Sequence, residues 1–246
     1  MIKIGLIGYG YWGKILYKKL EMFCNVKFTC RSKDTYLDKL DNIDWIVVAT
    51  PADTHFEIVR NCLWAGKNVF CEKPLTLTYK ESEELFNIAK SNNVKLYVDD
   101  IQNYREYDFE IMENNLVERR KLGGNLRDVL YVLAYHDLYV LYKYIKYSEI
   151  ETITLIDNKN ILHFKIKFND ISIEFVYDTN YEDERLHNIN GVSLMGDGTD
   201  DPLNDMLKTV IIDNNVDFQY NKKITLFTNN IIDVLNKQFK NKEKVI

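Results

Sequence analysis

The sequence lacks the features that mark several large classes of protein. Its four cysteines, Cys24, Cys30, Cys62 and Cys71, form no Cys-x-x-Cys pair. Three of the four fall in apolar strand or helix patterns, so we expect reduced thiols in the core and no metal site. No apolar run reaches membrane-spanning length, because charged residues and a histidine interrupt even the richest stretch, 126–142. No internal repeat or low-complexity segment stands out.

A strong excess of charge of either sign is also missing. The net charge is -5, with 28% of the residues charged, which gives no electrostatic reason to expect nucleic acid or an anionic membrane as a partner. The chain has 246 residues, of which 46% are hydrophobic, and this is enough to bury one or two cores. An apolar strand pattern begins at Ile2 and leaves no room for a signal peptide, so we expect a cytoplasmic protein.

A glycine-rich turn near the N-terminus is the most informative feature that is present. Gly8-Tyr9-Gly10-Tyr11-Trp12-Gly13 follows the apolar run Ile2–Ile7 and precedes a helical pattern. In such a turn the first glycine permits the tight bend, the second lets the backbone approach a pyrophosphate, and the third lets the helix pack on the strand. Amides at the start of the helix then face the phosphate charge. The pattern predicts a dinucleotide site that includes Gly8, Gly10, Tyr11, Trp12 and Gly13.

Strand and helix patterns alternate through the first hundred residues, which predicts a parallel sheet of the Rossmann type. The expected strands are Ile2–Ile7, Val26–Cys30, Trp45–Ala49, Asn68–Cys71 and Lys95–Val98, and the expected helices are Trp12–Met22, Thr54–Ala65 and Lys80–Ser91. Only residues 31–44 separate the second and third strands. This crossover is therefore expected to hold at most a short helix around Tyr36–Leu40.

The second half of the sequence has a different character. Three β-rich runs, Ile150–Ile156, Ile161–Phe168 and Ile171–Tyr177, follow one another at short intervals and predict an antiparallel meander. We expect a long helix over Asn125–Tyr147 and a terminal helix over Asn230–Phe239. The predicted fold class is α/β, with an N-terminal Rossmann domain over 1–120 and a C-terminal α+β domain over 121–246 that contains a mainly antiparallel open sheet.

Several motifs in register resemble the Gfo/Idh/MocA family of oxidoreductases, named after glucose-fructose oxidoreductase and inositol dehydrogenase. They are Gly8–Gly13, Ala49-Thr50-Pro51 with His55 downstream, Ala65–Val69, Cys71-Glu72-Lys73-Pro74, Val98-Asp99-Asp100, Ala134–Leu138 and Asp201-Pro202-Leu203. The resemblance implies that Thr50, Pro51, Glu72 and Lys73 contact a nicotinamide dinucleotide. It also implies a substrate domain whose open sheet forms an interface between copies of the chain, so we expect a homo-oligomer. This chain is short for the family.

Lys73 and His136 are the candidate catalytic residues. Oxidation of a secondary alcohol needs a base for the hydroxyl proton while hydride leaves for the nicotinamide, and the reverse reduction needs the same group as an acid. Lys73 follows a parallel strand at its carboxyl end, where open α/β sheets bind ligands. His136 matches the histidine of the family's helix motif. The resemblance implies a sugar or nucleotide sugar as the small-molecule substrate, often in surface-glycan biosynthesis.

One departure from the family pattern keeps an alternative open. In the family an aspartate lies four residues before the histidine and shares its helix face, but Val132 occupies that position here. The missing carboxylate would orient the imidazole or tune its basicity. Neither Asp128 nor Asp137 can replace it without help from another segment. The alternative function is therefore a catalytically degenerate dinucleotide-binding subunit with a regulatory or scaffolding role.

The end of the second strand decides which dinucleotide is expected. An acidic residue there binds the ribose hydroxyls of NAD, whereas basic or hydroxyl residues suit the 2′-phosphate of NADP. Cys30 is followed by Arg31, Ser32 and Lys33, with Asp34 only afterwards. Arg31 can pair with phosphate and Ser32 adds a donor, so we expect NADP, with NAD as the alternative.

The sequence predicts the roles of His55 and of the polar residues after the fifth strand less specifically. His55 either touches the dinucleotide or only fastens the start of its helix. Candidates to line a substrate cleft are Asp99, Asp100, Gln102, Asn103, Tyr104 and the pair Arg119-Arg120, but no pattern separates them from ordinary surface residues. His163 and His187 are expected to be structural or surface residues.

Overall fold

The computed structural model describes residues 1–31, 33–121, 126–146, 148–180, 185–195 and 200–243, and it contains two compact units. The first unit comprises Met1–Tyr104 and Asp201–Asn229, and the second comprises Arg105–Asp200 and Asn230–Ile246. The boundary between the two units therefore differs from the predicted domain boundary at residue 120. Strand β6, Asn114–Arg120, pairs with strands of the second unit, and the chain later returns to the first.

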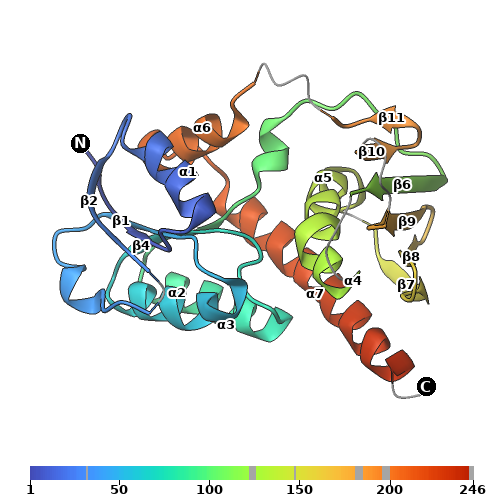
Figure 1. Ribbon diagram of the computed structural model, residues 1–246, viewed down its shortest axis with the longest axis horizontal. Coiled ribbons are helices and arrows are strands. Elements are labelled where there is room, and N and C mark those ends of the chain that lie inside the picture. Colours follow the sequence, from blue (N-terminus) through green and yellow to red (C-terminus); the bar gives the residue numbers. More distant parts are fainter. Residues whose placement is uncertain (32, 122–125, 147, 181–184, 196–199, 244–246) are drawn as a thin grey trace. The chain divides into compact units, whose positions relative to one another are not determined.

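The first unit contains a parallel sheet of five strands in the order β2-β1-β3-β4-β5. Its strands are β1 Lys3–Ile7, β2 Asn25–Cys30, β3 Trp45–Val48, β4 Asn68–Cys71 and β5 Leu96–Val98. Its helices are α1 Tyr11–Leu20, α2 His55–Trp64, α3 Tyr79–Ser91 and α6 Pro202–Leu207, and a π-helical turn, Lys208–Ile212, extends α6. Figure 1 shows α2 and α3 side by side. The predicted Rossmann sheet and its helices are confirmed.

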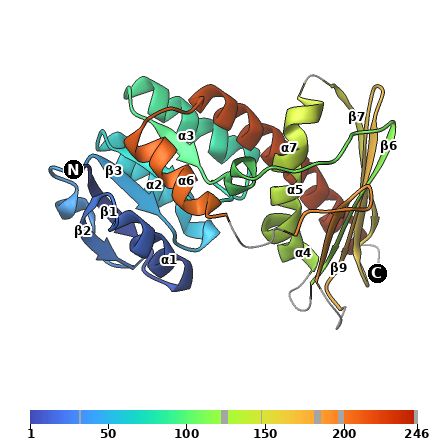
Figure 2. The same ribbon diagram turned by 90° about the horizontal axis from the view of Figure 1, so that it is seen from above.

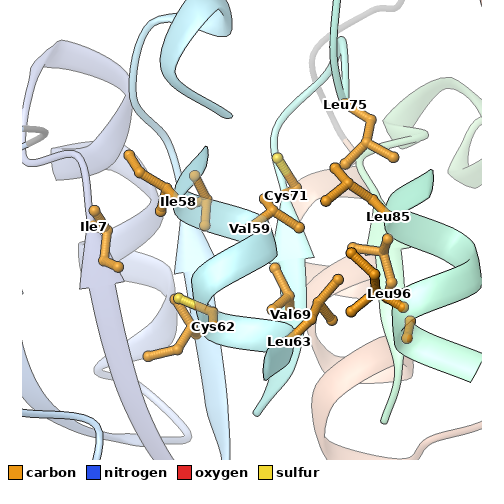
Figure 3. Packing of buried hydrophobic residues seen from close by; sticks show 14 of the residues in the cluster. Ile7, Ile58, Val59, Cys62, Leu63, Val69, Cys71, Leu75, Leu85 and Leu96 are labelled. Carbon is orange, nitrogen blue, oxygen red and sulfur yellow. The ribbon is translucent and has the colours of Figure 1, made fainter. Parts of the chain in front are cut away.

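Alternating side chains of this sheet enter two separate cores. On one face Ile7, Val69, Cys71 and Leu96 pack against α2 and α3 (Figure 3). On the other face Leu6, Val47, Phe70 and Tyr97 pack against α1 and α6. Because both faces are covered, the strands consist almost entirely of apolar residues, as is usual for a buried parallel sheet.

The crossover between β2 and β3 is as short as predicted. Its described residues, 31 and 33–44, contain one 3-10 turn, Leu37–Lys39, where a full helix is usual in such folds. Tyr36 and Leu40 flank the turn and are buried, so two side chains anchor a connection that lacks a helix. Two further 3-10 turns, Ala52–Thr54 and Ile101–Tyr104, follow β3 and β5.

Helix α7, Phe218–Glu243, is much longer than the predicted terminal helix over 230–239. Its first half belongs to the first unit and completes the exposed edge of the sheet. The side chain of Asn221 accepts a hydrogen bond from the amide of Val98 and donates one to the carbonyl of the same residue, both at 2.9 Å. Asn229 donates to Ser82 Oγ at 2.6 Å. The prediction missed this half because polar amides make several of its buried contacts, and a hydrophobic pattern does not reveal them.

The second unit contains a six-stranded sheet in the order β11-β10-β6-β9-β8-β7. Besides β6, its strands are β7 Ile150–Asp157, β8 Leu162–Phe168, β9 Ser172–Asp178, β10 Leu186–Ile189 and β11 Val192–Ser193. The predicted meander corresponds to β7, β8 and β9, and the mainly antiparallel character is confirmed. The prediction missed β6, β10 and β11. Strand β6 runs parallel to β9 and antiparallel to β10, which joins segments far apart in the sequence.

One face of this sheet is covered by the predicted long helix (Figure 2). The helix comprises α4 Leu126–Val129, a π-helical turn Leu130–Ala134 and α5 Tyr135–Ile145, while Asn125 lies outside the described residues. The second half of α7 also contacts the unit, since Gln238 donates to the carbonyl of Ile153 at 2.7 Å. Phe164 and Phe175 stack with ring centroids 4.5 Å apart in the covered core. Within the described residues, no helix is long and apolar enough to cross a membrane.

A buried polar cluster joins α5 to the sheet. Asp137 is 0% exposed. Its carboxylate accepts a hydrogen bond from the Tyr177 hydroxyl at 2.9 Å and contacts His187 Nε2 at 2.7 Å. Arg119 lies 3.6 Å from the same carboxylate and 3.0 Å from His187 Nδ1. Because guanidinium nitrogens only donate, Nδ1 is the acceptor and Nε2–H donates to Asp137. Burial alone would raise the pKa of Asp137, but Arg119, His187 and Tyr177 together lower it.

We predict that Tyr177→Phe destabilises the protein by about 1.5–3 kcal/mol, because the substitution keeps the ring but removes a donor to a buried carboxylate. Urea unfolding measures the change. Tyr36→Phe is the matched control, since the Tyr36 hydroxyl accepts a long hydrogen bond of 3.4 Å from the neutral Asn61. Equal losses in the two variants would show that the carboxylate does not depend on Tyr177.

Candidate functional site

The ends of four neighbouring strands meet at the carboxyl edge of the first sheet. Backbone hydrogen bonds continue past each strand: Ala49 N–H donates to Ile7 O at 2.8 Å, Glu72 N–H to Val48 O at 2.9 Å, and Asp99 N–H to Cys71 O at 2.9 Å. The strand order reverses between β1 and β3. Ligands of open α/β sheets bind in the crevice outside such a reversal, so the sheet places its switch point between Gly8 and Ala49.

The glycine turn has the geometry that its sequence predicts. Gly8 has a φ of +110°, and a Cβ there would lie 2.3 Å from backbone atoms of Ala49. A Cβ on Gly13 would lie 1.7 Å from the carbonyl oxygen of Gly8. A Cβ on Gly10 would meet no atom within 4 Å. Thus Gly8 and Gly13 are required by packing, whereas Gly10 keeps a space open beside the backbone.

The start of α1 presents backbone donors at this space. Gly10 precedes the helix and contributes no side-chain cap, and no acidic residue occupies the first turn. The first helical hydrogen bond runs from Lys14 N–H to Gly10 O at 3.1 Å, so the amides of Tyr11, Trp12 and Gly13 precede the helical ladder. Tyr11 is 85% exposed. Free amides at the positive end of a helix form a site for a phosphate group.

Trp12 connects the glycine turn to the residue after β4. Its indole N–H donates a hydrogen bond to Glu72 Oε1. Glu72 is buried and is also hydrogen-bonded to the buried carboxyl group of Asp99. Burial, followed by the negative charge of Asp99, raises the pKa of Glu72 well above its usual range. The carboxyl group of Glu72, predicted to contact a dinucleotide, is thus engaged by two protein side chains.

Lys73 follows Glu72 and lies at the same edge of the sheet. It is half-buried. Its positive charge lowers the pKa of Glu72 and of Asp99, against the larger effect of their burial. Its ammonium group therefore lies within electrostatic reach of both carboxyl groups. A lysine in this position can polarise a carbonyl group or transfer a proton.

His55 joins two of the loops at this edge. Its Nδ1 lies 2.8 Å from the carbonyl oxygen of Pro74, and its Nε2 lies 2.8 Å from that of Thr50. The ring is 1% exposed, and burial lowers its pKa although the two carbonyls oppose the change. Both ring nitrogens therefore face backbone atoms. The Thr54 hydroxyl donates to the carbonyl of Pro51 at 2.7 Å and lies 2.7 Å from Thr50 Oγ1, from which it can accept; these bonds order the turn before α2.

The end of β2 contains both a basic and an acidic residue. The Arg31 side chain is exposed. The backbone amide of Arg31 donates to Asp34 Oδ2 at 2.6 Å, so the carboxylate turns back toward the chain. Ser32 lies outside the described residues. The Arg31 side chain is thus exposed, and the Asp34 carboxylate bonds to the backbone of the same residue.

His136 belongs to the second unit, where α5 begins at Tyr135. It is half-buried, while Val132 is 45% exposed. The turn that contains Val132 is π-helical, and a π turn holds one residue more than an α turn, so the four-residue alignment of a regular helix does not hold there. Asp137, the neighbour of His136, bonds to the sheet. The described part of the first unit brings together Gly8, Trp12, Thr50, His55, Glu72 and Lys73.

The sequence analysis did not identify the roles of Asp99 and Asp100. Asp99 accepts a hydrogen bond from the amide of Ile101 at 2.8 Å. Asp100 accepts from the Tyr97 hydroxyl at 2.7 Å and from Asn103 at 3.2 Å, and it is 4% exposed. The feature of the sequence that could have revealed these roles is the pair of adjacent aspartates directly after a buried strand. They are interior residues and not freely exposed lining residues of a cleft.

We predict that Gly13→Ala destabilises the first unit by about 2 kcal/mol or more, because the added methyl group overlaps the Gly8 carbonyl. Gly10→Ala is the matched control. It adds the same methyl group in open space at an ordinary φ of -86°, so its free energy of unfolding should stay within about 0.5 kcal/mol of the wild type. Equal destabilisation in urea unfolding would contradict the geometry of the turn.

We predict a pH-dependent contribution to stability from Asp100. Burial raises the pKa of Asp100 to about 6, against about 3.9 in an unfolded chain. The folded state therefore binds this proton more tightly, and the resulting stability is present below pH 4 and is lost as the pH rises to 6. Relative to Asp100→Asn, the wild type should lose about 2–3 kcal/mol between pH 4 and pH 7. A difference that is constant with pH in urea unfolding would contradict this.

Comparison with known proteins relates this geometry to a family. A profile of the GFO_IDH_MocA oxidoreductase family, with its NAD-binding Rossmann fold, matches residues 18–100. The scyllo-inositol 2-dehydrogenase (NADP(+)) of Bacillus subtilis is 29% identical over 157 residues, which are 55% of this chain and 42% of that protein. In four further matches to curated oxidoreductases, the chain spans 24% to 43% of their length.

Solved structures show the same fold over nearly the whole chain. A dehydrogenase (MviM) from Clostridium difficile superposes with a TM-score of 0.77 at 20% identity, covering 96% of this chain and 99% of that one. The UDP-N-acetylglucosamine 3-dehydrogenase GnnA from Acidithiobacillus ferrooxidans gives 0.73 at 16% identity, covering 92% and 95%. These likenesses concern the fold. Residues 18–100 thus match the Gfo/Idh/MocA family of oxidoreductases, and the rest of the chain shares the fold of these dehydrogenases.

Proposed function

We propose that this protein is an NAD(P)-dependent oxidoreductase that transfers hydride to or from a CH–OH group of a sugar or nucleotide sugar, in surface-glycan biosynthesis. The observation that carries the proposal is the glycine turn at the sheet's switch point, with its open space at Gly10 and the half-buried Lys73 at the same edge. The proposal assigns phosphate binding to the turn after β1 and proton transfer to the residue after β4, at the same edge of the sheet.

The residues present fit a dinucleotide. The amides of Tyr11, Trp12 and Gly13 would receive the pyrophosphate, because they precede the helical ladder and no side chain caps them. Arg31 would pair with the 2′-phosphate of NADP, together with Ser32. Thr50 and Pro51 would line the edge after β3. His55 is best explained as a positioning residue that holds the Thr50 and Pro74 loops.

Lys73 and His136 would donate or accept the proton, while the bound nicotinamide would accept or supply the hydride. In ketone reduction the Lys73 ammonium donates a proton to the oxygen that gains negative charge, and in alcohol oxidation the neutral amine accepts it. The His136 imidazole of the second unit is the other candidate to bind a substrate hydroxyl group or to transfer its proton. Its partner cannot be Asp137, whose carboxylate bonds to Tyr177 and His187.

The substrate class is supported by the proteins that share the fold and the family. Their names include a scyllo-inositol dehydrogenase and a UDP-N-acetylglucosamine dehydrogenase. Both act on a ring alcohol, by their names. We extend that class of substrate, a polyhydroxylated ring with or without a nucleotide, to this chain, and favour NADP as its cofactor because of Arg31.

A second candidate function is that of a catalytically degenerate dinucleotide-binding subunit. The specific observation in its favour is Val132, which is 45% exposed and stands where the family has an aspartate. Such a subunit would bind the dinucleotide through the glycine turn but would turn over no sugar. The two functions share the first unit and differ in what the second unit contributes.

We further propose that the protein is a cytoplasmic homo-oligomer. The four cysteines are buried free thiols, which suits a reducing compartment. The sheet face opposite α5 carries Leu116 and Ile156, which are 38% and 43% exposed and alternate with the buried Val117 and Leu155. A second copy of the chain is the partner we propose for this face, and a monomer in light scattering would contradict it.

We predict that purified protein binds NADPH more tightly than NADH in a fluorescence titration, and that a panel of keto-sugar nucleotides added to the same cuvette causes loss of the NADPH signal. Arg31→Ala should weaken NADPH binding about tenfold or more, since it removes a charge-assisted hydrogen bond, and should leave NADH binding nearly unchanged. Gly10→Ala should weaken binding of both without loss of stability.

Three results would separate the candidate functions. Substrate-dependent loss of NADPH fluorescence supports the oxidoreductase. Binding without consumption across the panel favours the degenerate subunit, and a gain of turnover in Val132→Asp would then show a weakened active site. Failure to bind either dinucleotide would overturn the proposal at its base.

A further inference from the structure

The carboxyl groups of Glu72 and Asp99 form a buried pair that the proposed hydride transfer does not use. Glu72 and Asp99 directly follow Cys71 and Val98, which are register partners on β4 and β5. They are 8% and 2% exposed, and their carboxyl groups lie close enough to interact. A hydrogen bond between two carboxyl groups requires a proton on one of them. Two carboxylates in contact and out of water cannot both ionise, as in other carboxyl pairs that share a proton.

The neighbours of the pair indicate where the proton lies. Trp12 Nε1–H donates to Glu72 Oε1, which leaves the second oxygen of Glu72 to carry the proton. Asp99 Oδ1 accepts from the amide of Ile101 at 2.8 Å, which stabilises a carboxylate. Trp12 stabilises a Glu72 carboxylate in the same way, so the proton lies between the two carboxyl groups and either one can carry the negative charge.

The charged and titratable groups around the pair are Lys73, Cys71, Asp100 and Tyr104. Lys73 interacts electrostatically with both members of the pair. Burial raises the pKa of the Cys71 thiol, which stays neutral. Asp100 interacts with Asp99 and accepts hydrogen bonds from Tyr97, Asn103 and Asn221. Lys73 is the cation among them, so the charge on the pair bears directly on its ammonium group.

We propose that Glu72 and Asp99 share one proton at neutral pH and act together as a positioning pair for Lys73, with one negative charge beside its ammonium whichever carboxyl group ionises. Trp12 attaches the pair to the glycine turn, so the charge beside Lys73 is linked to the segment that would bind the dinucleotide. The effect on turnover rests on the proposed function, whereas the shared proton does not.

Infrared difference spectroscopy tests the shared proton without a substrate. At pH 8 the wild type should show the carbonyl stretch of a protonated carboxylic acid, and this band should be lost in Glu72→Gln and in Asp99→Asn, where the remaining carboxyl group ionises alone. Asp100→Asn is the matched control and should keep the band, since Asp100 has a pKa of about 6. No band in the wild type, or a band that persists in Glu72→Gln, would overturn the proposal.

Folding of the variants is expected, because each amide reproduces the neutral acid. In Glu72→Gln the new side-chain amide would still accept from Trp12 and donate to Asp99. Should either variant fail to fold, the pH dependence of the wild-type band carries the test, since a band already absent at pH 6 overturns the proposal.

The pH profile of turnover tests the effect on Lys73. Each single variant keeps one negative charge beside the ammonium, so the pH of half-maximal turnover should shift by less than about half a unit. The double variant Glu72→Gln/Asp99→Asn keeps none, and its midpoint should fall by about one unit or more. A shift of one unit or more in both single variants would show two separate charges in the wild type and contradict the pair. A positive infrared result in a protein without turnover would leave the shared proton intact and reject only the proposed function.

Discussion

A carboxyl group buried at the end of β4 holds the functional edge of the first unit together. Glu72 accepts from Trp12 in the glycine turn and bonds to Asp99 at the end of β5, while its own amide donates to Val48 of β3. Three strand ends and the start of α1 thus meet at one side chain. A buried polar group that lacks a hydrogen-bond partner reduces stability by about 1–3 kcal/mol. Each of these segments is therefore held in the position in which it can bond to Glu72. The position of Lys73, one residue further, follows from that constraint.

The second unit is organised by the same kind of interaction. Asp137 on α5 is fully buried and is satisfied by Tyr177 from β9 and His187 from β10, with Arg119 from β6 close by. Three strands that are distant in the sequence are thereby tied to one helix. Removal of one partner from a buried charged cluster usually costs several kcal/mol. His136 is next to Asp137 in the chain, so the anchoring of Asp137 also sets how α5 presents His136.

The parts of the fold that could be predicted are those in which the signal is local. The glycine turn, the five parallel strands and the meander were predicted because strands and helices repeat with different periods and because only glycine tolerates the backbone of Gly8. Strand β6 and the first half of α7 were missed for the opposite reason. Residues 114–120 carry five polar side chains in seven positions. Helix α7 bonds to β5 through Asn221 and to Ser82 of α3 through Asn229. Their pairing depends on partners distant in the chain, which no local pattern reports.

Composition, periodicity and the glycine spacing by themselves determined the fold class and the site of the turn, because each of these depends on residues near one another in the chain. The candidates Lys73 and His136 came from short motifs that resemble those of a family. Only the tertiary structure decided which polar residues are interior. It showed that Glu72, expected to contact a ligand, interacts with Trp12 and Asp99. It also showed that both ring nitrogens of His55 face backbone carbonyls and that the Asp137 carboxylate bonds to the sheet. The physical reason is that the state of a carboxyl or imidazole group depends on burial and on the donors and charges around it, and these come from segments that folding alone brings together.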